Sequence, residues 1–91
     1  FGYEYESLAP KKKGKNMEPF LVTLYPMDRL QASSHEGQEF MYVLEGSVEI
    51  TLEGKIHVLS KGDAIYYDSN DNHFVRAHGD KPAKIIAVLS S

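Results

Sequence analysis

Residues 47–59 read SVEITLEGKIHVL, and this pattern predicts a β-hairpin. Apolar and polar side chains alternate through 48–53, which is the period of a strand with one buried face. Glu53-Gly54 is a two-residue turn signal, and a second β-rich run follows it at 55–59. The alternation divides the first strand into two faces. The residues expected in the core are Val48, Ile50 and Leu52, and those expected on the opposite face are Glu49, Thr51 and Glu53.

Runs of the same kind recur along the whole chain. They occupy 20–25, 39–44, 64–67, 73–77 and 83–89, with turn-forming residues between them. Tyr3, Tyr5 and Leu8 have the alternate spacing of an edge strand. No segment has sustained helical periodicity. We therefore expect a single all-β domain, a β-sandwich or β-barrel, at 20–91. An N-terminal segment with the edge strand and a basic loop precedes it at 1–19.

Composition limits the classes of function. The chain has 91 residues, a net charge of −3 and no cysteine. The lack of cysteine excludes a disulfide scaffold, a thiolate metal site and a cysteine nucleophile. The run KKKGKN at 11–16 is interpreted as a solvated loop rather than a phosphate-contacting patch. We expect no direct contact of this chain with nucleic acid, since such contact usually needs a basic face.

Cellular location is inferred from what the chain lacks. The longest apolar run, 85–89, is far too short to span a bilayer. The N-terminus has no signal-peptide pattern. We therefore expect no membrane partner and a cytoplasmic location. The chain begins with Phe1 rather than methionine, so we also expect it to be processed or cut from a longer protein.

The run at 39–44 is apolar on both faces. Met41 and Val43 share one face with Glu39, and the other face carries Phe40, Tyr42 and Leu44. A strand of this kind is covered on both sides. We expect the first face to line the interior and the second to be covered by another sheet layer, the N-terminal segment or a second subunit. A second copy, giving a homodimer, is the cover we expect.

An interior carboxylate at Glu39 must be paired, protonated or bound to a metal. His35 precedes it by four residues, and His73 begins a separate short strand. Two imidazoles and one carboxylate can form a three-ligand site with open positions for a divalent metal. The alternative is a polar cluster satisfied by mutual hydrogen bonds and water.

The pocket around this cluster is expected to bind a small molecule. One of the neighbouring tyrosines at 66 and 67 must point inward, and it can hydrogen-bond a ligand. No catalytic residue is assigned, because the sequence has no Ser-His-Asp spacing and no distinct general base beyond the cluster. The ligand-contacting residues that we expect are His35, Glu39, Met41, Val43, Tyr66, His73 and Val75.

Two spacings resemble the motifs of the cupin superfamily. The pattern Ser33-x-His35-x3-Glu39-x6-Gly46 is similar to the first motif, and Gly62-x5-Asp68-x-Asn70-x2-His73 is similar to the second. The resemblance covers about 20–89 and implies a jelly-roll barrel, or double-stranded β-helix. It also implies that His35, Glu39 and His73 match three of four metal ligands, for zinc, nickel, iron or manganese. The departures from the motifs are Ser33 for the first histidine, Asp68 and Asn70 for proline and glycine, and Ala77 for the terminal asparagine.

The segments 3–10 and 17–22 look like the lead-in found in bacterial regulators, which place a helix-turn-helix DNA-binding domain before a C-terminal cupin. The resemblance implies a small-molecule-sensing domain that reaches DNA only through an N-terminal domain missing from this chain. The alternatives are a metal-dependent cupin enzyme, a dioxygenase or isomerase, and a cupin module appended to another enzyme.

Overall fold

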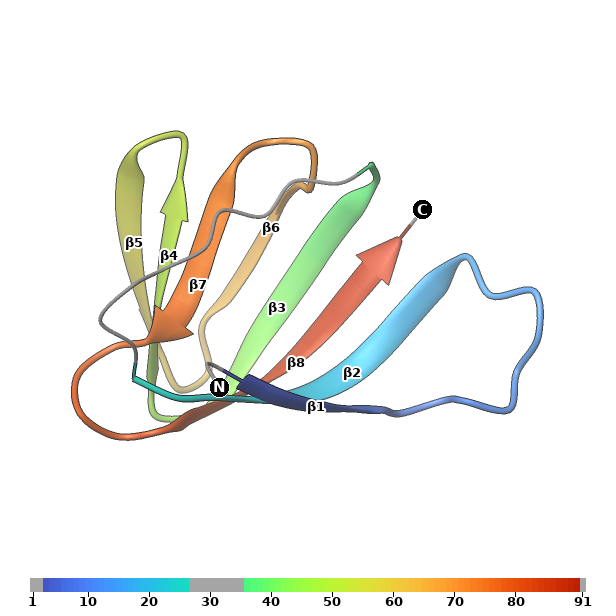
Figure 1. Ribbon diagram of the computed structural model, residues 1–91, viewed down its shortest axis with the longest axis horizontal. Coiled ribbons are helices and arrows are strands. Elements are labelled where there is room, and N and C mark those ends of the chain that lie inside the picture. Colours follow the sequence, from blue (N-terminus) through green and yellow to red (C-terminus); the bar gives the residue numbers. More distant parts are fainter. Residues whose placement is uncertain (1–2, 27–35, 91) are drawn as a thin grey trace.

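The computed structural model describes residues 3–26 and 36–90 and contains eight strands there, with no helix (Figure 1). No described segment is therefore a helix that could cross a membrane. The expectation of an all-β domain is confirmed. The strands are β1 (Tyr3–Ser7), β2 (Met17–Leu24), β3 (Gln38–Glu45), β4 (Ser47–Leu52), β5 (Lys55–Ser60), β6 (Ala64–Asp68), β7 (His73–Ala77) and β8 (Ala83–Ser90).

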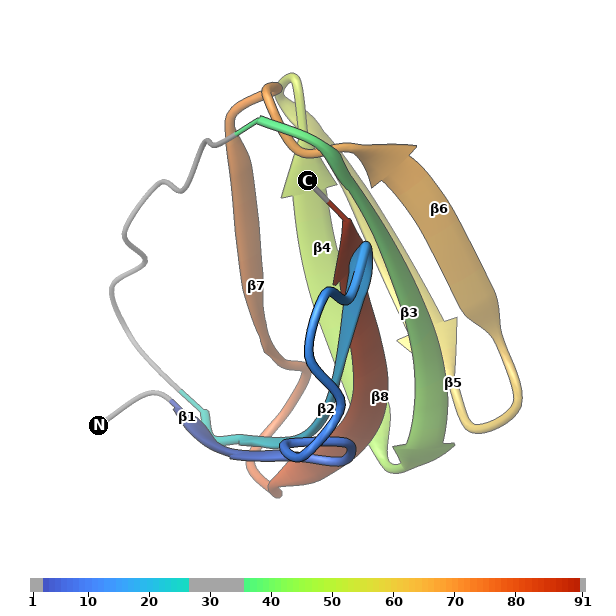
Figure 2. The ribbon, with the colours of Figure 1, turned by 90° about the vertical axis from the view of Figure 1, so that its right-hand side faces the viewer.

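Two antiparallel sheets form a sandwich of the jelly-roll kind. One has the order β1-β2-β8-β3-β6 and the other the order β5-β4-β7. Figures 1 and 2 show the two layers facing each other, with β5, β4 and β7 in one and β3, β8 and β2 in the other. Strands far apart in the sequence are thus neighbours, and the last strand, β8, lies between β2 and β3.

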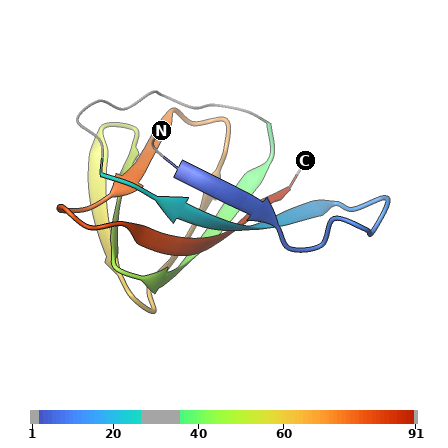
Figure 3. The ribbon, with the colours of Figure 1, turned by 60° about the horizontal axis from the view of Figure 1, so that its bottom comes forward.

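The N-terminal strand belongs to the larger sheet. β1 pairs along its whole length with β2, which begins at Met17, three residues before the expected start. Figure 3 shows the loop of this hairpin projecting beyond the rest of the sandwich. Lys15 ties the loop together by donating hydrogen bonds to the carbonyls of Ala9 (2.8 Å) and Lys12 (2.9 Å).

The core lies between the sheets and follows the expected alternation. Val43 of β3, Val48 and Ile50 of β4, and Ile85 of β8 have essentially no exposed surface. In β3 every second residue from Glu39 to Val43 is buried, as the sequence predicted. The inward face of this strand thus brings a carboxylate to the same interior as the hydrophobic core.

Glu49 departs from the expected pattern. Its face of β4 is the outer one, yet only 9% of the residue is exposed. The register places it opposite Arg76 of β7, whose Nε and Nη2 atoms both lie 2.9 Å from Glu49 Oε2. His78 Nδ1 lies 3.4 Å from the other carboxylate oxygen. Glu49 is buried because the side chains of Arg76 and His78 lie over it. The alternation within β4 does not predict this arrangement.

The turn between β3 and β4 depends on Gly46. Its φ of +77° lies in the left-handed region, which disfavours residues with a Cβ atom. A Cβ at this position would also lie 3.0 Å from the Pro82 carbonyl oxygen and 3.2 Å from the Cα of Ala83. The glycine therefore allows the β3–β4 turn to lie directly against the start of β8.

Candidate functional site

Three polar side chains meet between the sheets. Glu39 comes from β3 and Tyr67 from β6, and the register places them directly opposite each other in the larger sheet. His73 comes from β7 in the smaller sheet, where it pairs with Leu52 and shares its inward face. Glu39 and His73 are each 4% exposed, and Tyr67 is 8% exposed. The cluster thus joins the two layers inside the sandwich.

Glu39 is held from both sides. The Tyr67 hydroxyl donates a hydrogen bond of 2.9 Å to Oε2 of Glu39. His73 Nε2 lies 3.2 Å from the other oxygen, Oε1. The carboxylate that the sequence placed in the interior therefore has named partners, as a buried charge requires.

The protonation of His73 follows from its backbone contact. Its Nδ1 lies 2.8 Å from the carbonyl oxygen of Asp71, which can only accept a hydrogen bond, so Nδ1 carries a proton. In a neutral imidazole Nε2 then has a lone pair, and that lone pair faces Glu39. Both facing atoms, Nε2 and the carboxylate oxygen, are of the kind that a divalent cation binds. A metal-binding histidine usually donates its other ring N–H in this way, to a backbone carbonyl, a carboxylate or water.

Tyr67 is held in its neutral form. Burial raises the pKa of its phenol, and the negative charge of Glu39 and the hydrogen bond to it raise that pKa further. Tyr67 is consequently a hydrogen-bond donor at neutral pH.

The atom types that Glu39 and His73 offer are those that a divalent first-row metal ion binds. One carboxylate and one imidazole are nitrogen and oxygen ligands of the sort that iron, manganese, nickel and zinc accept. Within 3–26 and 36–90 no group of three such side chains occurs. His35, the third expected ligand, and Ser33 lie outside the described residues.

The apolar residues expected near the cluster lie on the inward faces. Met41 and Val43 are buried on the same face of β3 as Glu39. Val75, partly buried, packs against the core from the same face of β7 as His73. These positions are the ones expected for side chains that line the interior.

The position expected for Tyr66 is wrong. Tyr66 lies on the outer face of the larger sheet, is 62% exposed and donates a hydrogen bond of 2.5 Å to Gln38 Oε1. The inward tyrosine is Tyr67, which the sequence analysis did not assign. Tyr67 lies two residues after Ile65 and therefore on the same face of the strand, and Ile65 is a partly buried residue that packs against the core. This spacing is the signal that distinguishes the two tyrosines.

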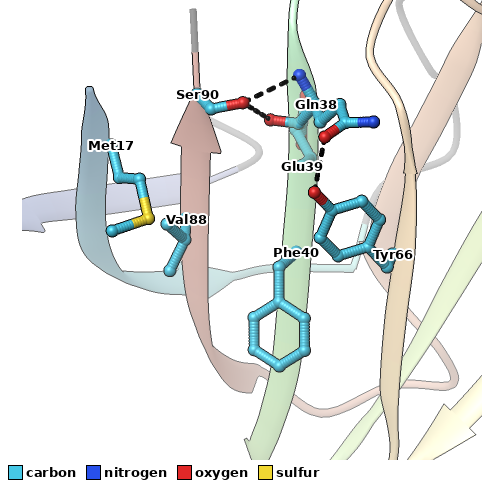
Figure 4. A pocket seen from close by; sticks show the side chains of 7 residues that line it. All are labelled: Met17, Gln38, Glu39, Phe40, Tyr66, Val88 and Ser90. Atoms are coloured by element: carbon cyan, nitrogen blue, oxygen red, sulfur yellow. Dashed lines mark hydrogen bonds between the residues drawn. The ribbon is translucent and has the colours of Figure 1, made fainter.

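A separate groove lies on the outer face of the larger sheet (Figure 4). Its volume is about 270 Å³. Glu39 contributes to it from the strand backbone, because alternation directs the carboxylate to the other face. The side chains that line the groove are Met17, Gln38, Phe40, Tyr66, Val88 and Ser90.

Comparison with known proteins gives one family and two kinds of relative. The model of the cupin domain family matches residues 20–89. (S)-2-Hydroxypropylphosphonic acid epoxidase from Streptomyces wedmorensis is 31% identical over 94 residues, which cover 94% of this chain and 48% of the enzyme. The chain therefore spans about half the length of this curated relative.

Solved structures show the same fold. The cupin domain of an XRE family transcriptional regulator from Enterobacter cloacae superposes with a TM-score of 0.86 at 19% identity, over 100% of this chain and 98% of that one. Fe(II) HppE, a hydroxypropylphosphonic acid epoxidase, superposes with a TM-score of 0.81 at 28% identity, over 97% of this chain and 50% of that one.

Proposed function

Since the chain belongs to the cupin domain family, we propose that it binds a small molecule at a divalent metal ion held by Glu39, His73 and His35. The observation that carries this proposal is the buried contact of 3.2 Å between Glu39 Oε1 and His73 Nε2. Because Nδ1 of the histidine already donates to Asp71, the lone pair of Nε2 and the carboxylate face the same point. A divalent cation at that point can take both atoms as ligands.

The residues around the pair prepare the site. The contact with Asp71 orients the imidazole, and Tyr67 orients the carboxylate. Met41 and Val43 exclude water from the interior side of β3. When bound, the metal would supply Lewis-acid polarisation of an oxygen atom on the small molecule.

The proposed biological role is sensing. We place the domain at the C-terminal end of an XRE-type helix-turn-helix regulator that acts in the cytoplasm and contacts DNA through a part missing from this chain. The lead-in at 3–10 and 17–22 supports this role, and the shared fold of the Enterobacter cloacae regulator domain is compatible with it. The gene is then expected to encode a helix-turn-helix before Phe1, and sequencing upstream is the direct check.

A second candidate function is a metal-dependent enzyme of the dioxygenase or isomerase class. The 31% identity with an epoxidase, and the likeness to its Fe(II) form, favour it. Turnover distinguishes the two roles. A sensor binds its small molecule and returns it unchanged, whereas the metal-loaded enzyme converts it to a product, with oxygen as co-substrate in the case of a dioxygenase.

Metal binding is tested on protein purified without chelator and reconstituted with Fe(II), Co(II) or Zn(II). We expect one metal ion per chain by elemental analysis. His35→Ala is expected to weaken the affinity by at least about 100-fold, because loss of a direct ligand costs no less than loss of the partners that orient ligands. His57→Ala, which removes an exposed histidine of β5, is the matched control. A protein that takes up no metal, or a His35→Ala variant that binds as the wild type does, contradicts the proposal.

We also propose that the outer groove joins two copies of this chain. Met17 and Tyr66 project from its rim with more than half of their surfaces exposed, while Phe40 and Val88 lie between them. In a two-fold dimer the same patch meets itself, so that the projecting side chains of one copy enter the groove of the other. This arrangement covers the second apolar face of β3.

Met17→Glu is expected to convert the dimer to a monomer at micromolar concentration, because the two-fold axis brings two like charges to one interface. Ile56→Glu is the matched control, since Ile56 is as exposed as Met17 but lies on the smaller sheet. Sedimentation velocity measures the outcome. A wild-type protein that sediments as a monomer, or a Met17→Glu variant that remains dimeric, overturns the dimer.

A further inference from the structure

We propose that Tyr67 is a positioning residue of the metal site, whose hydroxyl holds Oε2 of Glu39 so that Oε1 is the oxygen presented to the metal. The inference rests on the proposed metal site and adds to it Tyr67, which occupies one of the unspecified positions of the second sequence motif. It concerns the way in which the carboxylate binds, not whether it binds.

The contact between the two residues is part of the sheet itself. Glu39 and Tyr67 are cross-strand partners of β3 and β6, so their side chains leave the same face side by side. The hydroxyl donates to Oε2 at 2.9 Å, and both groups are more than nine-tenths buried. Buried hydroxyls are costly without a partner, and Glu39 is the partner here.

Tyr67 also contacts the second ligand. Its ring lies edge-to-face against the imidazole of His73, with ring centroids 5.1 Å apart and planes at 61°. One side chain thus restricts the carboxylate by a hydrogen bond and the imidazole by packing. The Asp71 carbonyl restricts the imidazole from its other nitrogen.

A carboxylate can bind a metal through one oxygen or through two. A donor on Oε2 opposes two-oxygen binding, because the hydrogen bond would have to break for Oε2 to turn toward the metal. The contact therefore favours binding through Oε1 alone, beside His73 Nε2, which is 3.2 Å away. Binding through one oxygen leaves one more coordination position for the small molecule.

The test compares two neighbouring tyrosines. Tyr67→Phe removes only the hydroxyl that holds Glu39. Tyr66→Phe is the matched control, since it removes a hydroxyl from the outer face of the same strand. Co(II) is the probe, because the intensity of its visible absorption reports the number of ligands. We expect Tyr67→Phe to change the Co(II) spectrum and to raise the Kd by about 10- to 100-fold, as loss of a ligand's hydrogen-bond partner does. Tyr66→Phe should change neither.

The outcomes separate this inference from the proposal on which it rests. Wild-type protein that binds no Co(II) overturns the metal site and the inference together. Wild-type protein that binds Co(II), with a Tyr67→Phe variant of the same spectrum and affinity, overturns the inference alone. Thermal unfolding of the metal-free variants shows whether the fold is kept. If Tyr67→Phe does not fold, Tyr67→Met fills the same space with a flexible side chain that has no donor, and the same criteria apply.

Discussion

His73→Ala is expected to abolish tight metal binding and to destabilise the metal-free domain by about 3 kcal/mol, because a buried carboxylate loses one of the side chains that it contacts. The substitution leaves the Glu39 carboxylate, 4% exposed, with the Tyr67 hydroxyl but without the imidazole. It also opens a cavity between the two sheets. Urea unfolding of the metal-free protein measures the stability, and titration with Co(II) or Zn(II) measures the affinity.

Glu39→Gln separates the two effects of that substitution. Glutamine is close to glutamate in shape, its carbonyl can accept the hydrogen bond from Tyr67, and it brings no charge into the interior. We therefore expect the variant to lose metal binding while its free energy of unfolding stays within about 1 kcal/mol of the wild type. A His73→Ala protein that binds metal as tightly as the wild type would show that the pair serves only the fold.

Gly46→Ala is expected to lower the free energy of unfolding by about 3 kcal/mol, the sum of backbone strain and steric overlap of about 1–3 kcal/mol each. The strain arises because alanine disfavours a φ of +77°. The overlap arises because the new Cβ would lie 3.0 Å from the carbonyl oxygen of Pro82. For a domain of this size the melting temperature should fall by about 10–20 °C.

Gly54→Ala is the matched control for the turn. Gly54 has nearly the same φ, +79°, but a Cβ there would meet nothing within 4 Å. Its substitution should cost only the backbone strain, about 1 kcal/mol. Equal losses in the two variants, measured by chemical denaturation, would mean that the closeness of Pro82 and Ala83 adds nothing to the cost of an alanine at position 46.

Much of the fold follows from local pattern. The hairpin at 47–59 and the two-faced strand at 39–44 appear where alternation predicted them. Glu39 and His73 were also expected in one interior cluster, and the structure brings them within 3.2 Å. For the first residue alternation was sufficient. For His73 the likeness to the second cupin motif was needed, since 33 residues separate it from Glu39 along the chain.

The sequence by itself determined the strands, the inward face of β3 and the two described members of the cluster, because alternation and motif spacing are properties of short segments. Only the tertiary structure decided that Tyr67 of β6 lies directly opposite Glu39 of β3, and that Arg76 and His78 bury Glu49. It also decided that the groove lined by Met17, Phe40 and Tyr66 lies outside the sandwich. These features join strands that are distant in sequence. They depend on sheet order and register, which are set by the packing of the two sheets rather than by any one segment.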